Sequence, residues 1–221
     1  MNIIKSINVL GIDFDIYKGP IGISFSGGAD SSLLLYMLML NSSEKIHIFT
    51  TVNNLKNRKN SIITSKVIDK CIELTGNINI EHHLNYVEEQ DISNLFSICK
   101  KWLINNYIKV IYTGITNTPP IEILESFKNK IDSVDGEQRK PNIIKPTFSN
   151  KFYMPFNNIN KQKIADLYNH YKLINNLFPL TRSCEWTTCY GEPDPGIGHC
   201  NKCWWCEERI WGFNKFNKRK H

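Results

Sequence analysis

Residues 26–31, with the sequence Ser-Gly-Gly-Ala-Asp-Ser, are the segment of this chain best suited to bind phosphate. They lie between apolar residues 21–25, typical of a short buried strand, and apolar residues 32–40, typical of a buried helix. Gly27 and Gly28 let the backbone turn sharply, and the start of the helix adds unpaired N–H groups and a positive dipole end. Such a nest of donors binds anions. The spacing differs from the Walker loop and from the dinucleotide-binding Gly-x-Gly-x-x-Gly turn.

A second group of reactive side chains lies near the C-terminus. Five of the seven cysteines fall in one short segment: Cys184, Cys189, Cys200, Cys203 and Cys206. In a cytosolic protein disulfides are rare, so clustered thiols indicate a metal. Residues 200–206 hold two overlapping Cys-x-x-Cys units, a spacing that lets thiolates converge on one tetrahedral zinc. Either Cys184 or Cys189 is available as the fourth ligand, His199 is a weaker candidate, and an iron–sulfur cluster is the rival to zinc.

The elements that position these residues alternate between strand-like and helix-like stretches. Further strands are expected at 45–50, 77–84 and 110–112, and further helices at 61–75, 93–107 and 162–171, with Cys71 and Cys99 on apolar helical faces. This alternation is typical of an α/β fold with a mostly parallel, doubly wound sheet and an active site at the carboxyl ends of its strands. We expect Gly114 on that same edge, beside the nucleotide. The polar residues 132–151 predict an insertion loop, either a lid or a long connection.

Composition and charge limit the class of protein further. A chain of 221 residues, 41% of them hydrophobic, can bury a core without disulfides, and its formal net charge of +6 suits an anionic partner such as ATP. The apolar run Leu33–Leu40 is far shorter than the roughly 20 residues that span a bilayer. The N-terminus lacks the zones of a signal peptide, so we expect a cytoplasmic protein with no membrane partner.

The order of the motifs resembles that of a known enzyme family. Residues 26–31 resemble the S-G-G-x-D-S pyrophosphate-binding loop (PP-loop) of the ATP pyrophosphatase superfamily. They are followed by Met-Pro-Phe at 154–156, by Lys161 in a Lys-x-x-Ile segment, by Thr-Arg-Ser-Cys at 181–184, and by the cysteines and an arginine at 200–209. This ordered set, spread over residues 24–213, is similar to that of the 7-cyano-7-deazaguanine (preQ0) synthases.

The resemblance implies a fold, a reaction and a set of ligands. The fold is a nucleotide-binding α/β domain of the adenine nucleotide alpha hydrolase type at 1–180, followed by a zinc-binding lobe at 181–213 and a basic tail at 214–221. Family members convert 7-carboxy-7-deazaguanine, ammonia and ATP into preQ0, and a homodimer is also implied. By matching positions, the phosphates of ATP fall to Ser26, Gly27, Gly28, Asp30 and Ser31, and zinc falls to Cys184, Cys200, Cys203 and Cys206, with Cys189 spare. Zinc held by four thiolates would be structural, since it has no open position.

The implied chemistry assigns catalytic roles to three residues. A carboxylate attacks the α-phosphorus of ATP, and ammonia displaces AMP from the acyl adenylate, so the protein mainly positions reactants and neutralises charge. Asp30 is the candidate to bind Mg²⁺ or to brace the loop. Lys161 and Arg182 are the cationic candidates to face the phosphates or the substrate carboxylate, with surface charge as the alternative.

Two segments depart from the family pattern and leave other functions open. Residues 53–58 replace the family's Tyr-Gly-Gln-Arg-His element, and residues 114–117 run straight into Pro119-Pro120. In the family these segments line the nucleotide and acceptor sites. Their divergence therefore weakens the prediction of the acceptor substrate more than the prediction of ATP. The alternatives are another PP-loop enzyme, such as an amide-forming relative or a tRNA-thiolating or amidating enzyme, and a zinc-ribbon protein that stacks nucleic-acid bases on Trp204, Trp205 and Trp211. Direct nucleic-acid binding is the less favoured interpretation, because the basic end of the chain is typical of a solvated tail.

Overall fold

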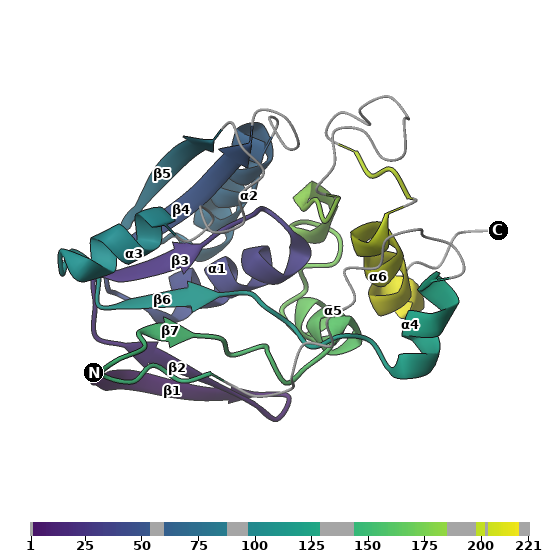
Figure 1. Cartoon of the computed structure of the whole chain (residues 1–221), viewed down its shortest axis with the longest axis horizontal. Coiled ribbons are helices and arrows are strands. Elements are labelled where there is room, and N and C mark those ends of the chain that lie inside the picture. Colours follow the sequence, from purple (N-terminus) through teal and green to yellow (C-terminus); the bar gives the residue numbers. More distant parts are fainter. Residues whose placement is uncertain are drawn as a thin grey trace.

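A five-stranded parallel sheet forms the centre of the molecule (Figure 1). The computed structural model describes residues 2–53, 60–87, 97–128, 144–184, 198–201 and 203–216. Across the sheet the strands are β5 (Ile80–Val87), β4 (Ile46–Asn53), β3 (Ile21–Ser24), β6 (Val110–Thr113) and β7 (Phe152–Tyr153), and each pair of neighbours is parallel. The predicted α/β fold with a mostly parallel sheet is therefore confirmed.

The strand order reverses beside β3. From β3 the chain builds outward to β4 and β5, then returns to place β6 on the other side of β3. Both central strands are buried on their two faces, as their continuous apolar sequences require. The segments that follow β3 and β6 therefore leave the same edge side by side, at the point where open α/β sheets bind ligands.

Helices cover both faces of this sheet. On one face α1 (Ala29–Asn41), α2 (Asn60–Thr75) and α5 (Lys161–His170) share the main core with Ile21 and Ile23 of β3. On the other face α3 (Ser97–Ile104) packs against Phe49 and Ile111. The predicted core cysteines, Cys71 and Cys99, are both fully buried, one under each layer of helices.

Several elements differ from the sequence prediction. The expected strand at 77–84 begins only at Ile80, because the Asn77 side chain donates hydrogen bonds to the carbonyls of Met39 and Ser42 at the end of α1. The pattern did not predict a hairpin of β1 (Ile3–Val9) and β2 (Ile12–Tyr17), nor α4 (Ile121–Lys128) and α6 (Trp204–Phe213). Two short 3-10 helices, Phe178–Leu180 and Asn214–Phe216, complete the described elements.

Part of the predicted insertion loop can be placed. Residues 132–143 lie outside the described residues, whereas Ile144 bridges Met154 and the Lys145 ammonium lies 3.0 Å from Asp15 Oδ2. The end of this segment is thus attached to the hairpin β1–β2. Among the described residues, none of the helices combines the length and apolar character that crossing a bilayer requires.

Buried tyrosine hydroxyls tie the hairpin to the sheet. Tyr112 on β6 accepts a hydrogen bond from the Tyr17 N–H at 3.0 Å and donates one to the Asp15 carbonyl at 3.0 Å. The Tyr153 hydroxyl accepts from the Asp15 N–H at 3.1 Å. The hairpin is therefore held by side chain to main chain hydrogen bonds as well as by apolar packing.

We expect Tyr112→Phe to lower the free energy of unfolding by about 1–3 kcal/mol, because a buried N–H and a buried carbonyl lose their shared partner. Urea denaturation followed by circular dichroism measures this difference. Tyr107→Phe is the matched control, since Tyr107 is 60% exposed. An equal loss of stability in both variants would contradict the interpretation.

Candidate functional site

A cavity of about 480 Å³ opens at the edge of the sheet where β3 and β6 end. Ser26, Gly28, Asp30 and Ser31 line it from the segment after β3, Gly114 from the segment after β6, and Lys161, Arg182 and Cys184 from later segments. Phe25, Phe49, Ile115, Trp205 and Glu208 also contribute to its walls. The cavity thus brings together the predicted site residues except Gly27, Cys200, Cys203 and Cys206.

Residues 26–31 form a compact loop held by two serine hydroxyls. The hydroxyl oxygens of Ser26 and Ser31 are 3.1 Å apart, and the Gly28 N–H donates to Ser26 Oγ at 3.3 Å. Gly28 is the N-cap of α1 and, having no side chain, offers no acceptor to the first N–H groups of the helix. An uncapped helix start of this kind, facing a cavity, is suited to bind an anionic group.

The glycines of this region are required by close contacts. Gly27 has a φ of +74°, and a Cβ there would lie 3.1 Å from a methyl carbon of Ile63 on α2. A Cβ at Gly114 would lie 2.8 Å from the Ser31 backbone nitrogen. Gly114 therefore lets the chain after β6 pack directly on the first turn of α1, and its contact with a nucleotide stays a prediction.

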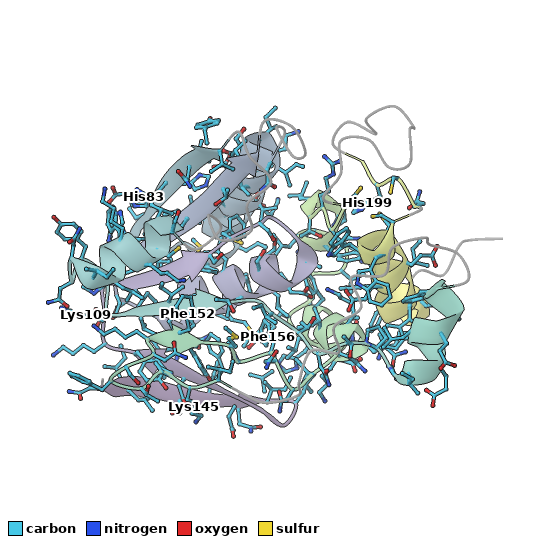
Figure 2. The ribbon with its side chains drawn as sticks, in the orientation of Figure 1. His83, Lys109, Lys145, Phe152, Phe156 and His199 are labelled. Carbon is cyan, nitrogen blue, oxygen red and sulfur yellow. The ribbon has the colours of Figure 1, made fainter. Side chains whose placement is uncertain are left out.

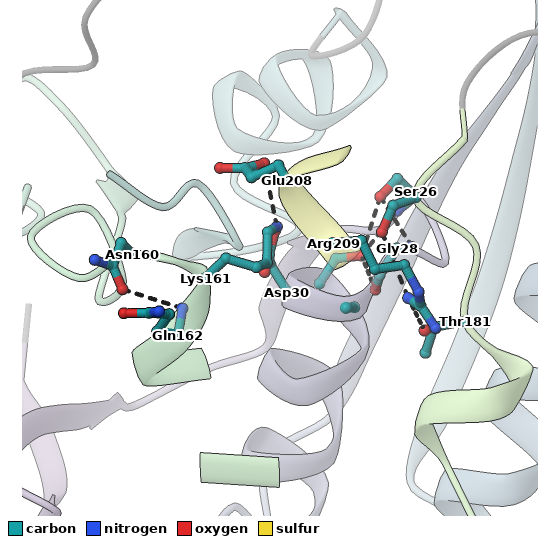
Figure 3. Close-up of polar contacts among 12 residues, drawn as sticks. Ser26, Gly28, Asp30, Asn160, Lys161, Gln162, Thr181, Glu208 and Arg209 are labelled. Atoms are coloured by element: carbon teal, nitrogen blue, oxygen red, sulfur yellow. Dashed lines mark hydrogen bonds and ion pairs between the residues drawn. The ribbon is translucent and has the colours of Figure 1, made fainter. Parts of the chain in front are cut away.

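Lys161 is buried between two carboxylates (Figure 3). It is the first residue of α5, directly after Asn160, whose side-chain oxygen accepts hydrogen bonds from the N–H groups of Gln162 and Lys163. Its ammonium forms an ion pair with Asp30 and lies 3.6 Å from Glu208 Oε2. Lys161 is only 4% exposed, so the alternative that it is surface charge is excluded.

The sequence did not single out Glu208. Its side chain is as buried as that of Lys161, and it comes from α6, which lies in the segment that the resemblance placed in the zinc-binding lobe. One oxygen of each carboxylate, Asp30 Oδ1 and Glu208 Oε1, is buried without a hydrogen-bond partner among the described residues. Arg209 also acts electrostatically on Asp30, so the oxygens that remain unpartnered are the donors available to a ligand. This donor set fits a hard divalent cation such as Mg²⁺, which binds carboxylate oxygens.

Arg182 and Arg209 hold the segment between the glycine loop and the cysteines. The Arg182 N–H donates to the Gly27 carbonyl at 2.9 Å, which joins this segment to the loop by a main-chain bond. Arg182 is 7% exposed, so surface charge is excluded for it as well. Arg209 donates to Thr181 Oγ1 at 2.7 Å and to the Phe178 carbonyl at 2.9 Å, and its guanidinium lies over the Phe178 ring. Burial lowers the pKa of Arg209 to about 10.

Four of the cysteines converge on one point. The sulfur atoms of Cys184 and Cys203 are 3.9 Å apart, those of Cys200 and Cys206 are 3.8 Å apart, and all four lie within 4.8 Å of one another. A tetrahedral zinc with four thiolates at 2.3 Å would separate the sulfur atoms by about 3.8 Å. The set therefore fits zinc in both chemistry and spacing.

The structure also bears on the other candidate ligands. His199 Nδ1 lies 3.9 Å from Cys206 Sγ, at the side of the four-sulfur group, and burial lowers the pKa of this imidazole to about 4. Cys189 lies outside the described residues. Cys203 is the N-cap of α6, and its N–H donates to the Cys200 sulfur at 3.3 Å. The cysteine group is thus built around the start of α6.

Trp204 is too buried to stack on nucleic-acid bases. Trp204 is 2% exposed and packs edge to face on Phe127 of α4, with the ring centroids 5.0 Å apart. Trp205 and Trp211 are partly buried and pack on the same apolar cluster, and Trp205 also lines the cavity. The interpretation that Trp204 stacks on nucleic-acid bases is therefore wrong, because the ring belongs to the packing between α4 and α6.

No protein-family model matches the sequence, and no curated protein matches it significantly. Among solved structures, the ammonia-dependent NAD synthetase of Campylobacter jejuni is 13% identical, with a TM-score of 0.40, over 72% of this chain and 66% of that one. The NMN synthetase of Francisella tularensis is 12% identical, with a TM-score of 0.45, over 89% of this chain and 84% of that one. Likenesses this distant assign neither residues nor an activity to this chain.

We expect Lys161→Met to lower the free energy of unfolding by about 3–5 kcal/mol, because it removes the ammonium that pairs with both buried carboxylates. Adding Glu208→Leu to that variant removes one of these charges and should restore part of the loss. Chemical denaturation of both variants measures the difference, with Lys66→Met on the exposed side of α2 as the control. A double variant no more stable than Lys161→Met would contradict the interpretation.

We expect one equivalent of zinc to remain bound after dialysis against EDTA, because four thiolates enclose the ion completely. Mass spectrometry of the metals in the dialysed protein measures this content. Cys203→Ser should lose the zinc, and Cys99→Ala, which removes a buried thiol on the far face of the sheet, should retain it. A brown protein that contains iron in place of zinc would contradict the expectation.

Proposed function

We propose that this chain is an ATP-dependent ligase that adenylates the carboxylate of 7-carboxy-7-deazaguanine and joins it to ammonia, forming preQ0. One observation carries the proposal. A glycine loop at an uncapped helix start, a buried lysine–carboxylate group and one cysteine of a zinc-type cluster all border the same cavity at the switch point of a parallel sheet. The order of these motifs along the chain resembles that of the preQ0 synthases.

Each part of the cavity has a role in this reaction. The N–H groups of residues 26–31 would hold the pyrophosphate of ATP as it leaves, helped by the positive end of the α1 dipole. Asp30 and Glu208 would hold Mg²⁺, which offsets the charge of the phosphates when it is bound. Lys161 and Arg182 add positive charge at the same wall. The aromatic ring of Trp205 would face a planar ring of adenine or of the acceptor.

The reaction proceeds in two activations. A carboxylate oxygen of the acid attacks the α-phosphorus of ATP, and the bond to pyrophosphate breaks. Ammonia adds to the resulting acyl adenylate, AMP leaves, and the amide forms after loss of a proton. The amide oxygen attacks the α-phosphorus of a second ATP, the bond to pyrophosphate breaks, and the nitrogen loses one of its two protons. AMP then leaves as the nitrogen loses its remaining proton, which gives the nitrile. The protein contributes orientation and charge stabilisation rather than a covalent intermediate.

We expect the protein to convert 7-carboxy-7-deazaguanine to preQ0 with ATP, Mg²⁺ and ammonium, releasing AMP and pyrophosphate. Mass spectrometry of the products distinguishes acid, amide and nitrile in one experiment. Asp30→Asn should lower the rate by at least about 100-fold, because it removes a charge that positions both Lys161 and Mg²⁺. Lys66→Met should leave the rate unchanged.

The products also separate the alternatives. Accumulation of the amide alone would indicate an amide-forming relative. AMP formed only when tRNA replaces the acid would indicate a tRNA-modifying PP-loop enzyme. ADP as the nucleotide product, or no turnover of this acid by the unaltered protein, would overturn the proposal.

A further inference from the structure

Three side chains on β4 and β5 converge on the sheet face that α3 covers. The strands pair in parallel with His47 opposite Glu81 and Phe49 opposite His83, so these side chains share one face. His47 Nδ1 lies 3.1 Å from His83 Nε2. The two oxygens of Glu81 lie 3.7 Å from these nitrogens, one oxygen from each. All three ligand atoms are therefore within reach of one ion.

A hydrogen bond between the imidazoles accounts for only part of this geometry. It explains the contact of 3.1 Å, but the carboxylate oxygens lie beyond hydrogen-bond distance of both rings. A tetrahedral ion bound at 2.0–2.2 Å by nitrogen and oxygen would separate its ligand atoms by about 3.3–3.6 Å. The observed separations lie on either side of this value.

The surroundings hold the rings in place and leave a path from solvent. Trp102 of α3 packs on His47 and on His83, with ring centroids 4.9 and 4.6 Å apart. The side chains of His47 and His83 are 10% and 16% exposed, whereas that of Glu81 is 51% exposed. The imidazoles are thus preorganised, and Glu81 is free to adjust. Figure 2 shows His83 far from His199, which marks the cysteine group.

One neighbouring charge competes for Glu81. The Lys45 ammonium lies 3.7 Å from Glu81 Oε2, the oxygen that faces His47, and donates a hydrogen bond to the Ile80 carbonyl at 3.3 Å. Lys45 is long and partly exposed, so it is able to leave Glu81 when another cation binds.

We propose that His47, Glu81 and His83 form a second metal site, for a divalent ion of borderline softness such as Zn²⁺ or Co²⁺. Two imidazoles and one carboxylate are the donor set that zinc accepts when it keeps an open coordination position. This site differs from the cysteine group in its ligand atoms. It also releases its metal ion to a chelator more readily, because it has three ligands and an open position where the cysteine group has four thiolates. Phe49, whose ring stacks on His83 and whose atoms line the cavity, separates it from the nucleotide site.

The test is a calorimetric titration of the full chain with Zn²⁺, after EDTA has emptied exchangeable sites and left zinc on the cysteines. We expect one further equivalent to bind. His47→Gln and His83→Gln should each weaken this binding by at least about 100-fold. His82→Gln is the matched control, because His82 is the adjacent residue on β5 and bonds Thr50 on the opposite face. Zinc content at the cysteines reports that each variant is folded.

Two further measurements test the site without substituting a ligand. Lys45→Met should tighten Zn²⁺ binding several-fold, since it removes the competing cation. Co²⁺ added to the unaltered protein with zinc on the cysteines should give weak visible bands without thiolate charge-transfer bands. The absence of a second equivalent, equal loss in His82→Gln, unchanged affinity in Lys45→Met, or thiolate bands with Co²⁺ would each overturn the assignment.

Discussion

The buried ammonium of Lys161 is the interaction on which the arrangement of the cavity depends. Asp30, Lys161 and Glu208 come from α1, α5 and α6, so one charged group joins three helices that are far apart in the sequence. Burying any one of these charges alone would cost several kcal/mol, which its charged neighbours offset. Gly212 permits the contact, since a Cβ there would lie 2.3 Å from the Lys161 side chain. Ion pairs as well as apolar packing therefore fix the positions of α1, α5 and α6 relative to one another.

The sequence predicted what local patterns encode. Continuous apolar strands, the Ser-Gly-Gly turn and the Cys-x-x-Cys spacing are short-range features, and they located the sheet, the loop and three of the converging sulfurs. Glu208 carries no such pattern, because its partner Lys161 is 47 residues away (208 − 161). The hairpin β1–β2 was missed although β2 alternates between apolar and acidic residues at 12–16, which is a strand signal. Only β1 lacks this alternation, since Ile3 and Ile4 are adjacent and both exposed.

Helix α6 connects the cysteine group to the cavity. Cys203 caps the helix and Cys206 lies in its first turn, while Glu208 and Arg209 follow one turn later and reach Lys161 and Thr181. A helix is rigid over this length, so the position of the sulfur atoms determines where these two side chains lie. The cysteine group thus determines the shape of the cavity in two ways: Cys184 lines it directly, and α6 positions Glu208 and Arg209 through backbone geometry.

A main-chain hydrogen bond from the Arg182 N–H to the Gly27 carbonyl fixes the segment before the cysteines against the glycine loop. It belongs to the main chain, so it survives every substitution at position 182 except proline, which has no N–H. The side chains of residues 182–184 line the cavity, yet the path of this segment is fixed independently of them. The main chain therefore fixes the position of this wall, and a substitution at Ser183 changes what the cavity presents without moving the glycine loop of residues 26–31.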